Sequence, residues 1–188
     1  MGIKLQWAEE PRVEFLDLVC TRGHKRQPMD HPYPLQQQLV DAAAFSDLDW
    51  LTQLLAKGVQ TEARDEEGRT PLHLAVQAGD RAAVCALLEA GSDCNARDAE
   101  GCSPLHHAAR NRDLSMAYLL VIHGADVNAQ DGAGTSVLWQ AVIASMNTGT
   151  VVQFLRRYGA NEQLENHRGF SARDLASRMG RPLEPRLP

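Results

Sequence analysis

Three glycines, at positions 68, 101 and 134, follow one another at intervals of 33 residues. The segment that starts at the first of them reads GRTPLHLAVQAGD, and the next reads GCSPLHHAARNRD. Self-similarity at a fixed period of this length is typical of proteins in which each repeat buries its apolar face against its neighbours. The period therefore predicts a stack of repeats.

The residue order within segment 68–100 predicts two helices joined by a short turn. Thr70 before Pro71 indicates a helix start, because the hydroxyl can cap the first turn and proline lacks an N–H that would go unpaired there. Gly79 and Gly91 stand where each helix would end in a left-handed residue. The apolar stripe expected on the buried side of the second helix consists of Ala83, Val84, Leu87 and Leu88.

With TPLH at residues 70–73 and SPLH at residues 103–106, the repeated segments strongly resemble the ankyrin repeat. The resemblance implies an all-α repeat solenoid: an ankyrin stack of helix-turn-helix repeats with projecting β-turns, a degenerate N-terminal cap repeat and a truncated C-terminal cap repeat. It implies that the histidine of the motif serves the hydrogen bonding of neighbouring turns. It also implies a non-enzymatic module that binds a protein partner, as an adaptor or an inhibitor.

The 33-residue register can be followed in both directions from its clearest copies, and it divides the chain into six segments. Two extra residues in the third clear copy are expected between its helices, near residues 145–150, and small insertions of this kind often lie on a binding side. The predicted segments are a non-repeat arm at 1–34 with a short helix at about 11–21, a degenerate repeat at 35–67, repeats at 68–100 and 101–133, the repeat with the insertion at 134–168, and a half-repeat cap at 169–188.

Segment 101–133 departs from the family pattern at two positions. His107 stands where the pattern has a leucine, and Arg112 stands where the helix-ending glycine is expected. A non-glycine residue in the left-handed conformation costs roughly 1 kcal/mol. We therefore expect this joint between helices to be looser or differently shaped.

Composition narrows the class of partner. A formal net charge of −5 and a pI near 5.8, without a clustered basic excess, argue against nucleic acid. No segment is apolar for long enough to cross a membrane, and the N-terminus lacks the apolar run of a signal peptide. The four cysteines fall at repeat positions, which favours a reduced compartment. We expect a cytoplasmic protein, or a nuclear one if the source is eukaryotic, that is a monomer when free.

Cofactor and catalytic chemistry find little support in the residue pattern. The best local candidate for a metal site is Cys102 with His106 and His107, but a structural zinc site needs four convergent ligands at characteristic spacing. The chain carries no glycine-rich phosphate loop, and no nucleophile with a base and an orienting third group is specified. We expect no metal, no cofactor and no catalytic residue.

The resemblance implies that the residues that differ between repeats contact the partner, on the projecting turns and at the exposed end of each first helix, along the concave face. Three glutamates make the N-terminal half of this surface acidic, so the expected partner carries a basic patch beside an apolar one. The expected contact residues are Glu66, Glu67, Arg69, Gln77, Ala78, Ala99, Glu100, Cys102, Arg110, Asn111, Gly132, Ala133, Thr135, Ile143 and Ala144.

Two other functions stay open from the sequence. The chain could be a stand-alone inhibitor of an enzyme, such as a kinase inhibitor or a bacterial toxin-neutralising immunity protein. It could also be a secreted effector whose segment 1–34 carries a targeting signal. Neither alternative changes the predicted fold.

Overall fold

The computed structural model divides the chain into two units, Met1–His31 and Pro32–Pro188, and it describes residues 34–145, 149–180 and 183. All of these residues belong to the second unit. The predicted arm, including its helix at about 11–21, lies outside the described residues except for Pro34.

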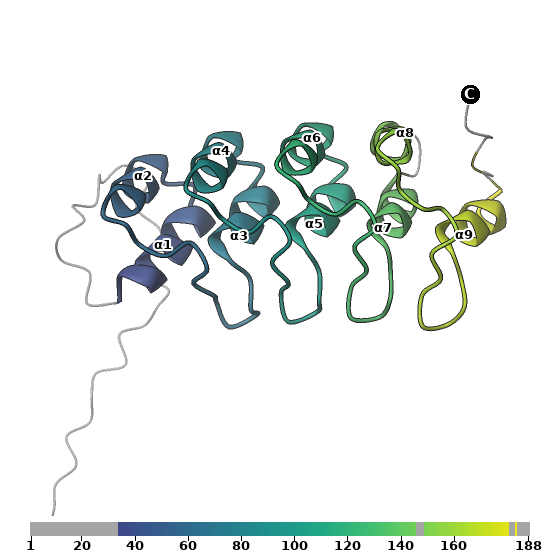
Figure 1. Cartoon of the computed structure of the whole chain (residues 1–188), viewed down its shortest axis with the longest axis horizontal. Helices are drawn as coiled ribbons and strands as arrows, with labels where there is room; N and C mark the ends of the chain where they lie inside the picture. The colour runs from purple at the N-terminus through teal and green to yellow at the C-terminus, as the bar shows by residue number, and fades with distance from the viewer. Residues whose placement is uncertain (1–33, 146–148, 181–182, 184–188) are drawn as a thin grey trace, which may run out of the picture. The chain divides into compact units, whose positions relative to one another are not determined.

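The described residues form nine α-helices arranged in two rows (Figure 1). The inner row lies beside the projecting turns and consists of α1 (Leu35–Ala44), α3 (Pro71–Ala78), α5 (Pro104–Arg110), α7 (Val137–Ala144) and α9 (Ala172–Arg178). The outer row consists of α2 (Leu48–Ala56), α4 (Arg81–Glu89), α6 (Leu114–Ile122) and α8 (Thr150–Arg157). This arrangement confirms the predicted all-α repeat solenoid.

Short polar side chains fix the helix starts in both rows, except at α1 and α8. Thr70 and Ser103 cap α3 and α5, where a histidine three residues later completes each capping box. In the outer row Asp47, Asp80 and Asp113 each accept a hydrogen bond of 3.0 Å from the third residue of their helix. The inner-row caps agree with the sequence prediction, and the outer row repeats the principle with aspartate.

Leucines at matching positions of successive repeats fill the space between the helices. Because each repeat packs only on its neighbours, the same position must be filled in every repeat, and burying one leucine contributes about 2 kcal/mol. In the inner row these fully buried residues are Leu39, Leu72, Leu105 and Leu138, and in the outer row they are Leu54, Leu87, Leu120 and Leu155.

The joint after α5 keeps the shape of the joint after α3 despite the missing glycine. Arg112 adopts the left-handed conformation with φ 59°, close to the φ of 72° at Gly79. The next residue, Asp113, donates its backbone N–H to Ala108 O at 3.0 Å, as Asp80 donates to Ala75 O at 3.0 Å. The expectation of a differently shaped joint was wrong, because the hydrogen bonds of the turn hold the arginine in the conformation that glycine would adopt.

A buried carboxylate ties the end of α8 to α9. Glu162 accepts from Arg156 Nε at 2.7 Å and from Arg173 Nη2 at 2.8 Å, one arginine from each helix. Burial raises the pKa of Glu162, but the hydrogen bonds from Arg173 and Arg156 outweigh it, and the net pKa lies below its usual range. The last inner helix is thus fastened to the stack by charge as well as by packing.

The segment that joins the two helices of a repeat is longer in repeat 134–168 than in the two repeats before it. Residues 145–149 separate α7 from α8, whereas residues 111–113 separate α5 from α6 and residues 79–80 separate α3 from α4. The predicted segment boundaries, including the half-repeat at the C-terminus, remain predictions. Among the described helices none is both long and apolar enough to span a bilayer.

Two glycines with positive φ differ in how closely other atoms approach them, and this difference tests whether neighbouring turns are in contact. A Cβ at Gly101 would lie 2.6 Å from the backbone nitrogen of Gly132 in the next turn, whereas a Cβ at Gly79 would meet nothing within 4 Å. Both have positive φ, so Gly79→Ala should lose about 1 kcal/mol of unfolding free energy through backbone strain alone. Gly101→Ala should lose at least about 1 kcal/mol more in urea denaturation, because two turns must separate. Equal losses would contradict close contact between the turns.

Candidate functional site

Each projecting turn is shaped by one side chain that accepts two backbone hydrogen bonds. Asp98 Oδ1 accepts from the N–H of Glu100 at 3.0 Å and from the N–H of Cys102 at 2.8 Å. Asp65 and Asp131 make the same pair of bonds in their own turns. An aspartate is suited to this role because its short carboxylate reaches amides two and four residues ahead. These aspartates were absent from the predicted site, although their 33-residue spacing was readable in the sequence.

Neighbouring turns are joined by backbone hydrogen bonds that use several predicted contact residues. Ala99 N–H donates to Glu67 O at 2.9 Å, and Gly132 N–H donates to Glu100 O at 2.8 Å. A Cβ at Gly132 would lie 2.7 Å from that same carbonyl oxygen, so a side chain there would push the turns apart. Gly132 therefore has a structural role at this position, and the two glutamates keep their side chains exposed.

Arg69 is held within its own turn. Its Nε donates to Asp65 Oδ2 at 2.7 Å, its Nη2 lies 3.0 Å from Glu67 Oε2, and its Nη1 donates to Gln77 Oε1 at 3.3 Å. Glu100 on the next turn forms no ion pair with any residue that the structure describes. The charge left unbalanced on these two turns is therefore negative.

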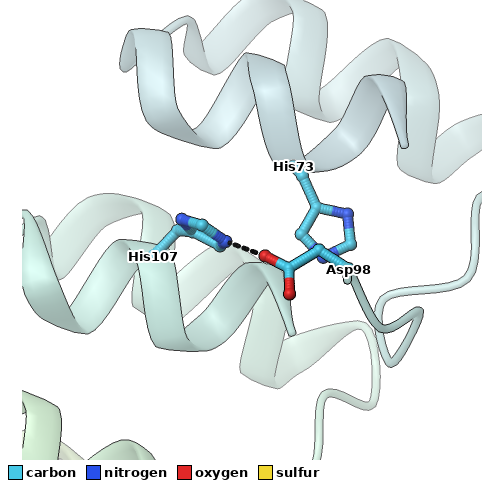
Figure 2. A group of neighbouring side chains, drawn as sticks. All are labelled: His73, Asp98 and His107. Atoms are coloured by element: carbon cyan, nitrogen blue, oxygen red, sulfur yellow. Dashed lines mark hydrogen bonds and ion pairs between the residues drawn. The ribbon is translucent and has the colours of Figure 1, made fainter. Parts of the chain in front are cut away.

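A buried histidine connects the turns to the inner helices. His107 Nε2 lies 2.8 Å from Asp98 Oδ2 (Figure 2). Its Nδ1 lies 2.7 Å from Arg110 Nη2 and 3.0 Å from Gln77 Nε2. Because a guanidinium can only donate, Nδ1 must accept, and the ring proton sits on Nε2 and points to the carboxylate. This network gives Gln77 and Arg110 fixed positions on the surface.

The charges of this network follow from burial. Burial lowers the pKa of His107, although the hydrogen bond to Asp98 opposes it. Burial raises the pKa of Asp98, but hydrogen bonds from His107 and from the backbone N–H of Cys102 outweigh it and leave that pKa lowered. A neutral imidazole therefore donates to an ionised carboxylate. The sequence marked His107 as a departure from the family pattern but did not indicate its link to Asp98.

The geometry of the nearby His73 bears on metal binding. His73, Asp98 and His107 place one ligating atom each within 4.8 Å of one another (Figure 2). Nδ1 of His73 accepts from the N–H of Thr70 at 3.1 Å, so its Nε2 carries the proton and donates to Cys102 O at 3.1 Å. A cation would have to displace a hydrogen bond at each imidazole, so the arrangement suits hydrogen bonding better than metal ligation.

Cys102 differs from its prediction as a contact residue. Its side chain is 3% exposed, and burial together with Asp98 raises the pKa of the thiol to about 12. Its backbone N–H and carbonyl belong to the turn and to the bond from His73. The position varies between repeats, but it faces the core, so it is removed from the surface considered below.

The other predicted contact residues lie on neighbouring turns and at the ends of α3, α5 and α7. Asn111 Nδ2 donates to Gln77 O at 3.4 Å, which joins the ends of two inner helices. Half-buried positions are Arg69, Gln77, Thr135 and Ala144, and exposed positions are Glu66, Glu67, Ala78, Ala99, Glu100, Arg110, Asn111, Gly132, Ala133 and Ile143. We call these 14 positions the concave surface.

Comparison with protein families agrees with this architecture. A family model described as ankyrin repeats, in three copies, matches residues 39–131. This part of the chain belongs to the ankyrin-repeat family. Ankyrin repeats are generally protein–protein interaction modules, and the family is a non-enzymatic one. No curated protein matches the chain.

Stability of this ankyrin stack should depend on pH through its buried imidazoles. Burial lowers the pKa of His73 and of His106 from 6.5 to about 4, so between these values the unfolded chain binds more protons than the folded one. The stabilising contribution of each neutral ring is therefore fully present above the ordinary histidine pKa, and it is lost as pH falls toward the lowered pKa. From about pH 7 to about pH 5 each ring should remove about 2 kcal/mol of unfolding free energy.

His73→Gln tests this assignment in urea denaturation series at each pH. The variant should show a smaller drop in unfolding free energy between the two pH values than the unmodified chain, whatever its absolute stability. An unchanged drop would show that His73 is not the neutral, buried group described above.

Proposed function

We propose that this ankyrin-repeat protein binds a protein partner through the concave surface, as an adaptor or an inhibitor. The observation that supports the proposal most strongly is the network from Asp98 through His107 to Gln77 and Arg110. Side chains that are already held in place lose less conformational freedom on binding, so they contribute more to affinity than mobile ones. Arg110 is such a side chain on an exposed position.

The charge pattern supports a partner with a basic patch. Glu66 and Glu100 lie exposed on adjacent turns and are in no ion pair with a described residue, and Glu67 shares only Arg69. Rim charges of one sign raise the rate of association with a partner of opposite sign and disfavour partners of the same sign. The rate should therefore fall as ionic strength rises.

The C-terminal part of the same surface is apolar. Ile143 at the end of α7 is 49% exposed, and the neighbouring Ala144 is half-buried. Gly132 and Ala133 on the adjoining turn carry no charge. A partner that sets an apolar patch next to its basic one would cover both halves of the concave surface.

The test is an affinity capture from lysate of the source cells, followed by mass identification of bound proteins. Glu66→Ala, Glu100→Ala and Arg110→Ala are combined in one variant, and Arg69 is kept because it holds Asp65. The variant should lose the captured partner, because two free carboxylates and the positioned guanidinium are removed. The two glutamate changes should each alter the unfolding free energy by no more than about 0.5 kcal/mol. Arg110→Ala also removes a hydrogen bond to the buried His107, so it should cost about 1 kcal/mol.

A double variant at Asp49 and Lys57, both exposed on or next to α2 in the outer row, is the matched control. It removes charges of both signs away from the concave surface and should retain the partner. Capture that survives the triple variant, or that is lost in the control, would reject the concave surface as the binding site. Adding the purified partner to its own activity assay then separates an inhibitor from an adaptor.

A further inference from the structure

Helix α6 exposes an apolar stripe on the outer row. Leu114, Tyr118 and Ile122 follow one another at four-residue intervals, and they are 41%, 47% and 51% exposed. Residues four apart lie on the same face of a helix, so the three side chains form one line along the solvent side of α6. The stripe is not needed for the core, because α6 packs on the core through other residues, which are Met116, Ala117, Leu119 and Leu120.

The preceding repeat lacks this stripe. The matching positions of α4, 33 residues earlier, are Arg81, Cys85 and Glu89, of which the first and last are charged and exposed. An outer helix that only covers the core would be expected to carry polar residues at such positions, as α4 does. Packing of the repeats therefore does not explain why α6 carries exposed apolar residues.

Aromatic rings extend the stripe onto α8. The rings of Tyr118 and Phe154 have centroids 6.3 Å apart, and those of Phe154 and Tyr158 have centroids 4.5 Å apart. Tyr158 is itself 44% exposed. We call Leu114, Tyr118, Ile122, Phe154 and Tyr158 the outer stripe. Contiguous exposed apolar patches on soluble proteins generally mark interaction sites.

The outer stripe lies on the row away from the projecting turns (Figure 1). It shares no residue with the concave surface, so an occupant of the one leaves the other accessible. Binding at the outer stripe is therefore independent of the proposed function.

Two opposite charges on α4, beside the outer stripe, are placed so that each can pair with the other one in a second copy of the chain. Arg81 and Glu89 stand at the two ends of α4, next to α6 in the outer row, and neither is in an ion pair with a residue that the structure describes. Consider a two-fold axis that passes beside Tyr118, perpendicular to α6 and directed along the outer row. Each outer-row helix then faces its own counterpart in the second copy. Arg81 lies opposite Glu89 of that copy, and Glu89 lies opposite its Arg81. A closed interface of this kind must be complementary to itself.

The same axis pairs the apolar residues. Leu114 lies opposite Ile122 of the second copy, and Tyr118 lies opposite its own counterpart. The two α6 helices run antiparallel, so their dipoles oppose each other favourably. Arg157 on α8 falls opposite the uncharged first turn of α8 in the second copy, so it meets no like charge there.

We propose that a second copy of this chain binds the outer stripe, with the two α6 helices antiparallel and Arg81 paired with Glu89 across the interface. A patch of five residues is small for a protein interface, so the dimer is a weak one that dissociates at on the order of 10 µM. The expectation of a free monomer then holds only for dilute protein.

Sedimentation velocity of the full chain from about 1 to about 200 µM measures this directly. The unmodified chain should pass from monomer to dimer across the range. Tyr118→Glu should remain monomeric throughout, because it brings two carboxylates together at the axis. Thr52→Glu is the matched control, since it occupies the same repeat position on α2 and is exposed there, and it should dimerise like the unmodified chain.

Charge exchange tests the arrangement. Arg81→Glu and Glu89→Arg should each weaken the dimer about tenfold, because each sets like charges opposite one another, and the double variant should restore it. Circular dichroism of every variant confirms that the helices are intact. A chain that stays monomeric at all concentrations overturns the proposal, even if the stripe captures another protein. A dimer indifferent to Tyr118→Glu, or not restored by the double variant, overturns it too.

Discussion

The middle of the ankyrin stack depends on two buried imidazoles, each of which joins one repeat to the next. In His73 one ring nitrogen closes the cap at Thr70, and the other reaches Cys102 O in the following turn at 3.1 Å. His106 makes the same connection from Ser103 to Thr135 O at 3.2 Å. A neutral ring can accept at one nitrogen and donate at the other, so a single side chain both starts a helix and fixes the distance to its neighbour. Burial keeps these rings neutral near physiological pH.

The hydrogen bonds between repeats use some residues to hold the stack and leave others available to bind a partner. Where the carbonyls and amides of the turns are already paired, only side chains such as Glu66 and Glu100 are left to meet a partner. His107 stands between the two groups, because it is buried like the stacking histidines but its hydrogen bonds end on exposed Arg110. A surface whose side chains are held from below in this way suits recognition with little reorganisation.

Much of the fold was readable from the sequence because it rests on local and periodic signals. Thr70 before Pro71 marked a helix start, and Gly79 marked a left-handed end, which the structure confirms at φ 72°. The link between Asp98 and His107 could not be predicted, since it joins a turn to a helix and depends on where both side chains point. Burial of Cys102 was missed for a related reason: variation between repeats suggested a surface position, but the turn directs the thiol inward. The outer stripe likewise emerges only from exposure, because leucine or tyrosine on an outer helix can face either side.

Native-state hydrogen exchange of a His106→Gln variant tests most directly whether the imidazole couples neighbouring repeats. His106 lies in α5, and its Nε2 bonds to the turn that leads into α7. Coupling predicts that amides of both α5 and α7 lose protection together, while amides of α1 keep more of theirs. Loss of protection confined to α5 would contradict this account, because the ring would then act only as a cap of its own helix.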